Sequence, residues 1–137
     1  MHAFAVRLTP GTDLREALER LTLEHRLRAG CILSGIGSLS HARLRMPGAA
    51  EAFLDLAEPV EIVSLAGTLC PDGPHVHLTL SRADGACVGG HLVQGCIVRT
   101  TAELVIGELQ AVGLRRLPDP DTGYRELSVE QGGSDGE

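Results

Sequence analysis

Only one stretch of this chain has a helical period, and most of the remainder is divided into short apolar segments by turn residues. Four apolar residues recur at helical spacing: Leu14, Ala17, Leu18 and Leu21. Asp13 precedes them and stands three residues before Glu16, a spacing typical of a helix N-terminus. We therefore expect one helix from Asp13 to about Arg28, with Gly30 as its stop.

The remaining apolar segments predict β-strands. Expected strands cover residues 2–8, 31–44, 60–69, 74–82 and 87–106, the last broken near Gly95, with one more between Gly107 and Pro118. The glycines within 31–44 indicate a bend or bulge in that strand. Residues 46–58 are expected to form a loop with a short helix or a hairpin.

One helix followed mainly by strands predicts an α+β fold. We expect a single compact domain in which a mixed or antiparallel sheet carries its main helix on one face. This domain should span residues 1–128, and a polar, disordered tail should follow at 129–137.

Composition limits the partners of the chain. Its 137 residues fit one domain, and only Phe4, Phe53 and Tyr124 are aromatic, so the core must consist of aliphatic residues and glycine. Twelve arginines, with no lysine, face eighteen acids, for a net charge of −6. This balance argues against direct nucleic-acid binding, which depends on neutralising phosphates.

The sequence also indicates a cellular setting. The N-terminus lacks a charged segment followed by a long apolar one, and no apolar run approaches the ~18 residues of a membrane span. Four cysteines have no Cys-x-x-Cys spacing: Cys31, Cys70, Cys87 and Cys96. We expect a soluble, cytoplasmic protein with free, mostly buried thiols and no membrane association.

Three of the six histidines fall in one predicted hairpin. His75 and His77 are two apart on a strand, so both side chains point to one face. A two-residue turn at Asp84 and Gly85 would send His91 to the opposite face. A three-residue loop at 83–85, with Gly85 in the left-handed conformation, would place His91 directly opposite His77.

With the three-residue loop, the three imidazoles can converge on one cation. Three neutral imidazoles without a fourth protein ligand are typical of catalytic rather than structural zinc. Gly89 and Gly90 would leave open space beside His91 for water or a ligand. The alternative is that His75, His77 and His91 are only polar residues on a solvated sheet face.

Glu103 is the candidate for a charged group near this cluster. It stands in an apolar stretch before Val105 and Ile106, where a carboxylate is paired, adjacent to a metal or at a sheet edge. If catalytic, it would move a proton near the metal. An ordinary outward-facing strand residue is the alternative.

At these residues the chain resembles the plants-and-prokaryotes conserved (PPC) domain family over nearly all of residues 3–128. The most specific parts of the resemblance are Gly73-Pro74-His75-x-His77-Leu78, Asp84-Gly85-x-x-x-Gly89-Gly90-His91-Leu92 and Thr101-x-Glu103. The resemblance implies a homotrimer with the histidine-bearing strands near subunit contacts, and zinc on His75, His77 and His91. It also carries the label "DNA-binding", because plant members join the domain to AT-hook motifs. This chain has no Arg-Gly-Arg-Pro segment.

The same three-histidine site is consistent with two alternative functions. The first is a homotrimeric zinc-binding protein, or one using another divalent transition metal, with a regulatory or sensing role. The second is a metal-dependent enzyme acting on a small molecule through the same three-histidine site, with Glu103 as its acid–base group. Direct DNA binding is the weakest interpretation.

Overall fold

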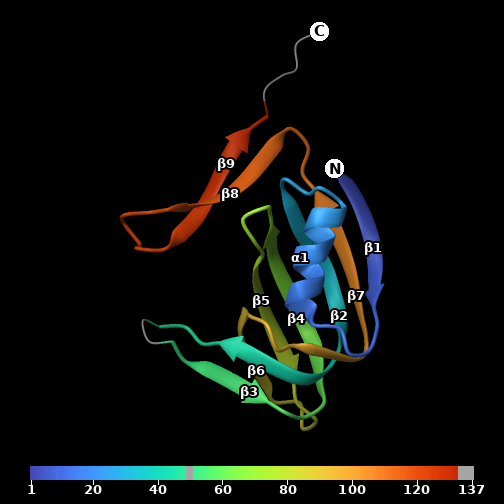
Figure 1. Ribbon diagram of the computed structural model, residues 1–137. Coiled ribbons are helices and arrows are strands. Elements are labelled where there is room, and N and C mark those ends of the chain that lie inside the picture. Colours follow the sequence, from blue (N-terminus) through green and yellow to red (C-terminus); the bar gives the residue numbers. More distant parts are fainter. Residues whose placement is uncertain (49–50, 133–137) are drawn as a thin grey trace.

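The computed structural model describes residues 1–48 and 51–132 of the chain. Its principal sheet has the order β1-β7-β2-β4-β5-β6, with β3 paired to β2, and every pairing among the described strands is antiparallel (Figure 1). The elements are β1 (His2–Leu8), α1 (Leu14–Glu24), β2 (Gly30–Arg45), β3 (Phe53–Leu56), β4 (Val60–Leu69), β5 (His75–Ser81), β6 (Cys87–Leu92), β7 (Ile97–Glu108), β8 (Val112–Pro118) and β9 (Arg125–Gln131). The protein is thus mainly β, and the expected antiparallel sheet with one helix is confirmed.

The length and curvature of β2 shape this sheet. Its first part pairs with β7 and β4, whereas its last residues pair with β3 and β6. The register shifts three times along β2, once beside Gly37, as the glycines of this segment predicted. The shifts accompany a turn of the strand that brings Leu44 and Arg45 against β6, so that β2, β4, β5 and β6 close on themselves.

Helix α1 covers one face of the sheet and supplies one side of the core. Asp13 caps it, because Asp13 Oδ1 accepts a hydrogen bond from the Glu16 backbone N–H at 3.0 Å. Asp13 Oδ2 also accepts from the Gly95 N–H at 2.8 Å, which ties the cap to the loop before β7. The helix packs its apolar stripe against alternate residues of the central strands, exemplified by Leu39, Leu80 and Leu104. The core is aliphatic, as the composition predicted.

The helix ends earlier than expected. It stops at Glu24, and Arg26 adopts a left-handed φ of 51°, while the Leu27 N–H donates to Thr22 O. Leu27 is thereby turned into the core, and its burial offsets the unfavourable backbone. Gly30, the expected stop, instead begins β2 where an added Cβ would lie 3.1 Å from Leu69 Cβ.

Two segments expected to be irregular contain strands. Residues 53–56 form β3, so the hairpin alternative for 46–58 holds there; residues 49–50 lie outside the described residues. The sequence does not predict strand β9, which includes residues 129–131 of the expected tail. Gly132 follows β9 and donates its N–H to Ala111 O at 2.7 Å, and residues 133–137 lie outside the described residues.

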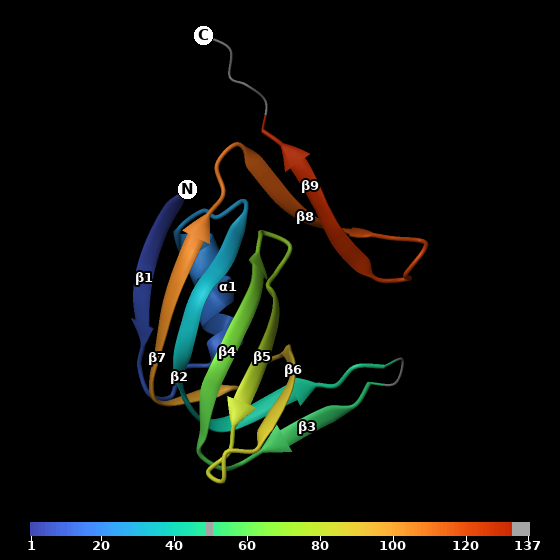
Figure 2. The same ribbon diagram turned by 180° about the vertical axis from the view of Figure 1, so that it is seen from behind.

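Strands β8 and β9 form a separate two-stranded hairpin that projects beside the principal sheet (Figure 2). A small apolar cluster of Ala29, Cys70 and Leu114 joins it to the body. The Leu114 N–H donates to Arg28 O at 2.8 Å, and Asp72 forms an ion pair with Arg115 at 2.7 Å. These contacts place the hairpin next to the start of β5.

Candidate metal centre

The three candidate histidines lie on the adjacent strands β5 and β6. His77 is directly opposite His91, and His75 is two residues before His77. Their neighbours Val76, Leu78 and Leu92 are buried in the core. The alternation of the strands therefore turns all three imidazoles away from the core and onto one surface.

This register is set by the three-residue loop. The Arg82 N–H donates to Ala86 O at 2.8 Å, which makes these residues the last pair before the turn. Gly85 has a left-handed φ of 85°, and the Asp84 carboxylate accepts the Ala86 N–H at 2.9 Å. The two-residue alternative is excluded, because the pairing of Ser81 with Cys87 continues to His77 and His91.

The imidazoles are close enough to share one ion. One candidate ligand nitrogen from each of His75, His77 and His91 lies within 4.8 Å of the others. The ring centroids are 4.4 Å apart for His77 and His91, 5.1 Å for His75 and His77, and 5.9 Å for His75 and His91. Nitrogens that are each about 2.0–2.1 Å from a shared zinc ion lie no more than about 4.2 Å apart, so small rotations of the imidazoles would bring this spacing to that of a zinc site.

An orphaned polar atom supports the same interpretation. His91 Nδ1 is buried and has no hydrogen-bond partner among the described residues. A buried polar atom without a hydrogen-bond partner raises the free energy of the folded state. A ligand or metal bound at His91 Nδ1 would remove this cost. The residues present therefore fit a divalent transition metal, which when bound would act there as a Lewis acid.

The surroundings of two of the imidazoles favour their neutral form. Burial lowers the pKa of His75, and the positive charge of Arg116 lowers it further. Burial likewise lowers the pKa of His91, with Arg45 as the next cause. Neutral imidazoles can donate a lone pair to a metal without first losing a proton.

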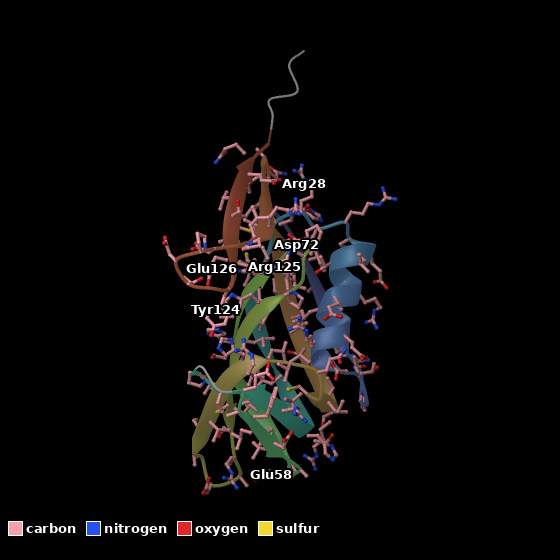
Figure 3. The ribbon with its side chains drawn as sticks, turned by 60° about the vertical axis from the view of Figure 1, so that its left-hand side comes forward. Arg28, Glu58, Asp72, Tyr124, Arg125 and Glu126 are labelled. Carbon is pink, nitrogen blue, oxygen red and sulfur yellow. The ribbon has the colours of Figure 1, made fainter. Side chains whose placement is uncertain are left out.

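A cavity of about 560 Å³ opens beside the cluster, between the body and the β8–β9 hairpin. His75 and His91 line it together with residues from the helix, β2 and the hairpin. Figure 3 shows Tyr124, Arg125 and Glu126 of the hairpin gathered near Asp72, whereas Glu58 lies at the far end of the body. Nothing in the sequence indicated that residues 116 and 124–126 would reach the histidines, because this proximity arises only from the placement of the hairpin.

The sequence predicted open space beside His91 at Gly89 and Gly90, and the structure has none there. A Cβ on Gly90 would lie 2.7 Å from Met46 Cε and 2.9 Å from Arg45 O, and a Cβ on Gly89 would lie 3.0 Å from a β5 carbonyl oxygen. Both glycines therefore permit close approach of neighbouring strands, which corrects the expectation of space beside His91. The cavity lies instead toward Arg45 and the hairpin.

Glu103 is placed apart from the histidines. It is exposed on β7, between Arg7 of β1 and Ile36 of β2. Strands β2 and β4 separate β7 from β5 in the sheet order, so the sequence-based expectation of proximity fails within one chain. The expectation failed because the order of strands in a sheet depends on pairing between segments far apart in the sequence. The local pattern of residues does not specify that pairing.

The cysteines are free, as expected, and none belongs to the histidine cluster. Cys70 and Cys96 are buried, Cys31 is half-buried, and Cys87 is exposed. No helix in the described part of the chain is long and apolar enough to cross a membrane.

The fold and the cluster together define a small antiparallel β protein with a surface three-histidine site. Its sequence matches the profile of the Plants and Prokaryotes Conserved (PCC) domain over residues 1–110, and the chain therefore belongs to this family. The β8–β9 hairpin lies beyond the matched residues.

Two groups of curated relatives extend the comparison. The chain is 46% identical over 131 residues to the bifunctional protein GlmU of Synechococcus sp. (strain JA-3-3Ab), covering 96% of this chain and 21% of that protein. It is 29% identical over 136 residues to AT-hook motif nuclear-localized protein 16 of Arabidopsis thaliana, covering 96% of this chain and 52% of the plant protein. The chain thus spans only part of the length of these relatives.

Two solved structures share the fold across nearly the whole chain. A hypothetical protein from Salmonella enterica has a TM-score of 0.91 and 42% identity, covering 95% of this chain and 94% of that one. A metal-containing protein from Archaeoglobus fulgidus has a TM-score of 0.81 and 28% identity, covering 93% and 94%.

Proposed function

We propose that this protein binds one zinc ion per chain through His75, His77 and His91, and that it acts as a homotrimer in a regulatory or sensing role. The observation that carries the proposal is the convergence of three imidazole nitrogens within 4.8 Å. Imidazole suits zinc and neighbouring transition metals better than it suits calcium or magnesium. The metal-containing relative from Archaeoglobus fulgidus supports metal binding on this fold.

The exposure of the site supports a regulatory or sensing role. His75 and His77 are exposed and His91 is only half-buried. Three ligands leave at least one coordination position free, unlike the closed four-ligand sites of structural zinc. Metal or a metal-bound ligand can therefore exchange with solvent without unfolding the core.

The outer face of the sheet supports self-association. Figure 2 shows the face of the sheet that α1 does not cover. Large apolar residues are exposed on its strands β2, β4 and β7: Leu33, Ile36, Val63 and Val105. Contiguous exposed apolar surface is typical of protein interfaces. We propose that copies of this chain cover it; the number three is what the family resemblance implies.

A metal-dependent enzyme is the second candidate, and the cavity beside His75 and His91 favours it. Such an enzyme needs room for a small molecule next to the open coordination position, and the cavity supplies that room. Glu103 of the same chain does not line this cavity, so within one chain any proton-moving group would be another residue.

Direct DNA binding receives little support from the chain itself. The AT-hook relatives extend well beyond the matched region, and the present chain carries a net charge of −6. We therefore propose that it makes no strong direct contact with DNA.

Metal analysis of untagged protein, purified without chelator, tests the central proposal. We expect about one zinc per chain in the wild type and a loss of most of it in His77→Ala. His41→Ala is the matched control, because His41 is exposed on β2 and hydrogen-bonds Ser40 rather than joining the cluster. A wild type without metal, or equal metal content in the wild type and His77→Ala, would contradict the proposal.

A further inference from the structure

The cavity beside the histidine cluster is positively charged in a protein that is acidic as a whole. Its lining contains two acids, Asp72 and Glu126, and four arginines: Arg15, Arg45, Arg116 and Arg125. The chain carries eighteen acids against twelve arginines, so this excess of positive charge is local. A concave surface that gathers one sign of charge concentrates ligands of the opposite sign.

The two acids in the lining are already engaged. Asp72 forms an ion pair with Arg115 at 2.7 Å and accepts the Arg116 backbone N–H at 2.9 Å. The backbone bond from Arg116 and the Arg115 guanidinium lower the pKa of Asp72, which keeps it ionised. Glu126 accepts the Thr122 hydroxyl at 3.1 Å. Arg15 is paired with Glu19 at 3.0 Å, outside the lining. These carboxylates therefore neutralise the cavity arginines only in part, and Arg45 and Arg116 carry the excess.

Arg45 is the arginine best placed beside the metal ligands. It is paired directly with His91 across β2 and β6, so the two side chains share a face. It is half-buried, and within residues 1–48 and 51–132 it has neither an ion-pair nor a side-chain hydrogen-bond partner. A half-buried guanidinium without a counterion is suited to an anionic ligand.

Arg116 approaches the cluster from the hairpin. Its Nη2 donates to Thr68 Oγ1 at 2.6 Å, which fixes the side chain against β4. Its Nε is buried and unpaired among the residues that the structure describes. Arg116 and His75 line this cavity together, so the guanidinium lies near that imidazole. The hairpin thus adds a second oriented guanidinium to the cavity.

We propose that this cavity binds a small molecule through a carboxylate or phosphoryl group, held by Arg45 and Arg116 next to the metal. Planar guanidinium groups match the paired oxygens of both anions, and the free coordination position can take a further oxygen of the same molecule. The cavity volume of about 560 Å³ is ample for such a ligand. The metal-bound half of this inference rests on the proposed zinc site; the arginine half does not.

Isothermal titration calorimetry tests the inference on zinc-loaded protein freed of excess metal. The probes are succinate for the carboxylate and methylphosphonate for the phosphoryl group, with neutral succinamide as the uncharged control. We expect at least one anion to bind and succinamide not to bind. Arg45→Gln and Arg116→Gln should each weaken binding roughly tenfold, the effect of removing one charge-assisted contact.

Arg20→Gln is the matched control, because Arg20 loses the same charge on the exposed side of α1, where it pairs only with Glu24. Arg116→Gln also removes the bond to Thr68, so Arg45→Gln decides the result if the hairpin is disturbed. Zinc content is measured on every variant. Zinc loading without arginine-dependent anion binding would overturn this inference alone. If the protein takes up no zinc but still binds the anion through its arginines, the proposed metal function is overturned and the arginine site stands.

Discussion

At the scale of single residues, burial decides which side chains can react. Cys96 is fully buried, and this burial raises the pKa of its thiol to about 11. The thiol donates to Arg43 O at 3.3 Å. Cys87 is exposed on β6. The thiolate is the reactive form, so the two cysteines should differ greatly in reactivity.

We predict that Cys87 gives the fastest reaction of the native protein with Ellman's reagent at pH 8, and that Cys96 reacts only after unfolding. At that pH, about three units below its pKa, the Cys96 thiol is almost entirely protonated. Cys87→Ser should abolish the fastest phase, and Cys96→Ser should leave it intact. A fast phase that persists in Cys87→Ser would contradict the structure.

The histidines were predictable at this scale, and the arginines were not. Residues two apart on a strand point to the same face, so His75 and His77 share a face regardless of how the strand is placed in the fold. Arg45 and Arg116 reach the same cluster from residues far away in the sequence, through pairings of β2 and β8 that no local pattern specifies.

At the scale of elements, the β5–β6 hairpin holds the site together through its loop. Gly85 has a left-handed φ of 85°, and an added Cβ would meet no heavy atom within 4 Å. A substitution there should therefore disturb the backbone conformation without a steric clash.

We predict that Gly85→Ala lowers the free energy of unfolding by about 1–2 kcal/mol, measured by urea denaturation. Gly85→Asn should cost less, because asparagine tolerates the left-handed region. Ala83→Ser, in the same exposed loop, is the control and should change little. Equal stability of Gly85→Ala and the wild type would count against the three-residue loop.

Elements with strong local signals were predicted well, and those defined by distant contacts were not. Strand β4 has the expected bounds because its apolar residues alternate between clear turns. The early end of α1 depends on burying Leu27, and β9 is held mainly by its partner β8, with Leu127 and Val129 left exposed. Neither feature has a local signature in the chain.

At the scale of the whole molecule, the sheet has one covered and one uncovered face. The covered face packs on α1, whereas on the opposite face Ile36 is 52% exposed and Val105 is 37% exposed. Glu103 lies on this same face, next to Ile36. If copies of the chain assemble through this face, Glu103 lies at a subunit contact.

We predict that Ile36→Glu lowers the molar mass of the native protein, measured by light scattering after size-exclusion chromatography. A buried charge at the interface would be costly, so the assembly should dissociate toward monomers. Leu23→Glu is the control, because Leu23 is 74% exposed on α1, away from this face. A wild type that is monomeric, or an unchanged mass for Ile36→Glu, would contradict assembly through this surface.

The zinc-binding histidine cluster is tested most directly by X-ray absorption at the zinc edge of the metal-loaded protein. We predict a first shell of nitrogen and oxygen only, at about 2.0–2.1 Å, with the outer scattering of three imidazoles. One imidazole contribution should be lost in His91→Ala. A sulfur shell near about 2.3 Å would place the metal on a cysteine and contradict the assignment of His75, His77 and His91.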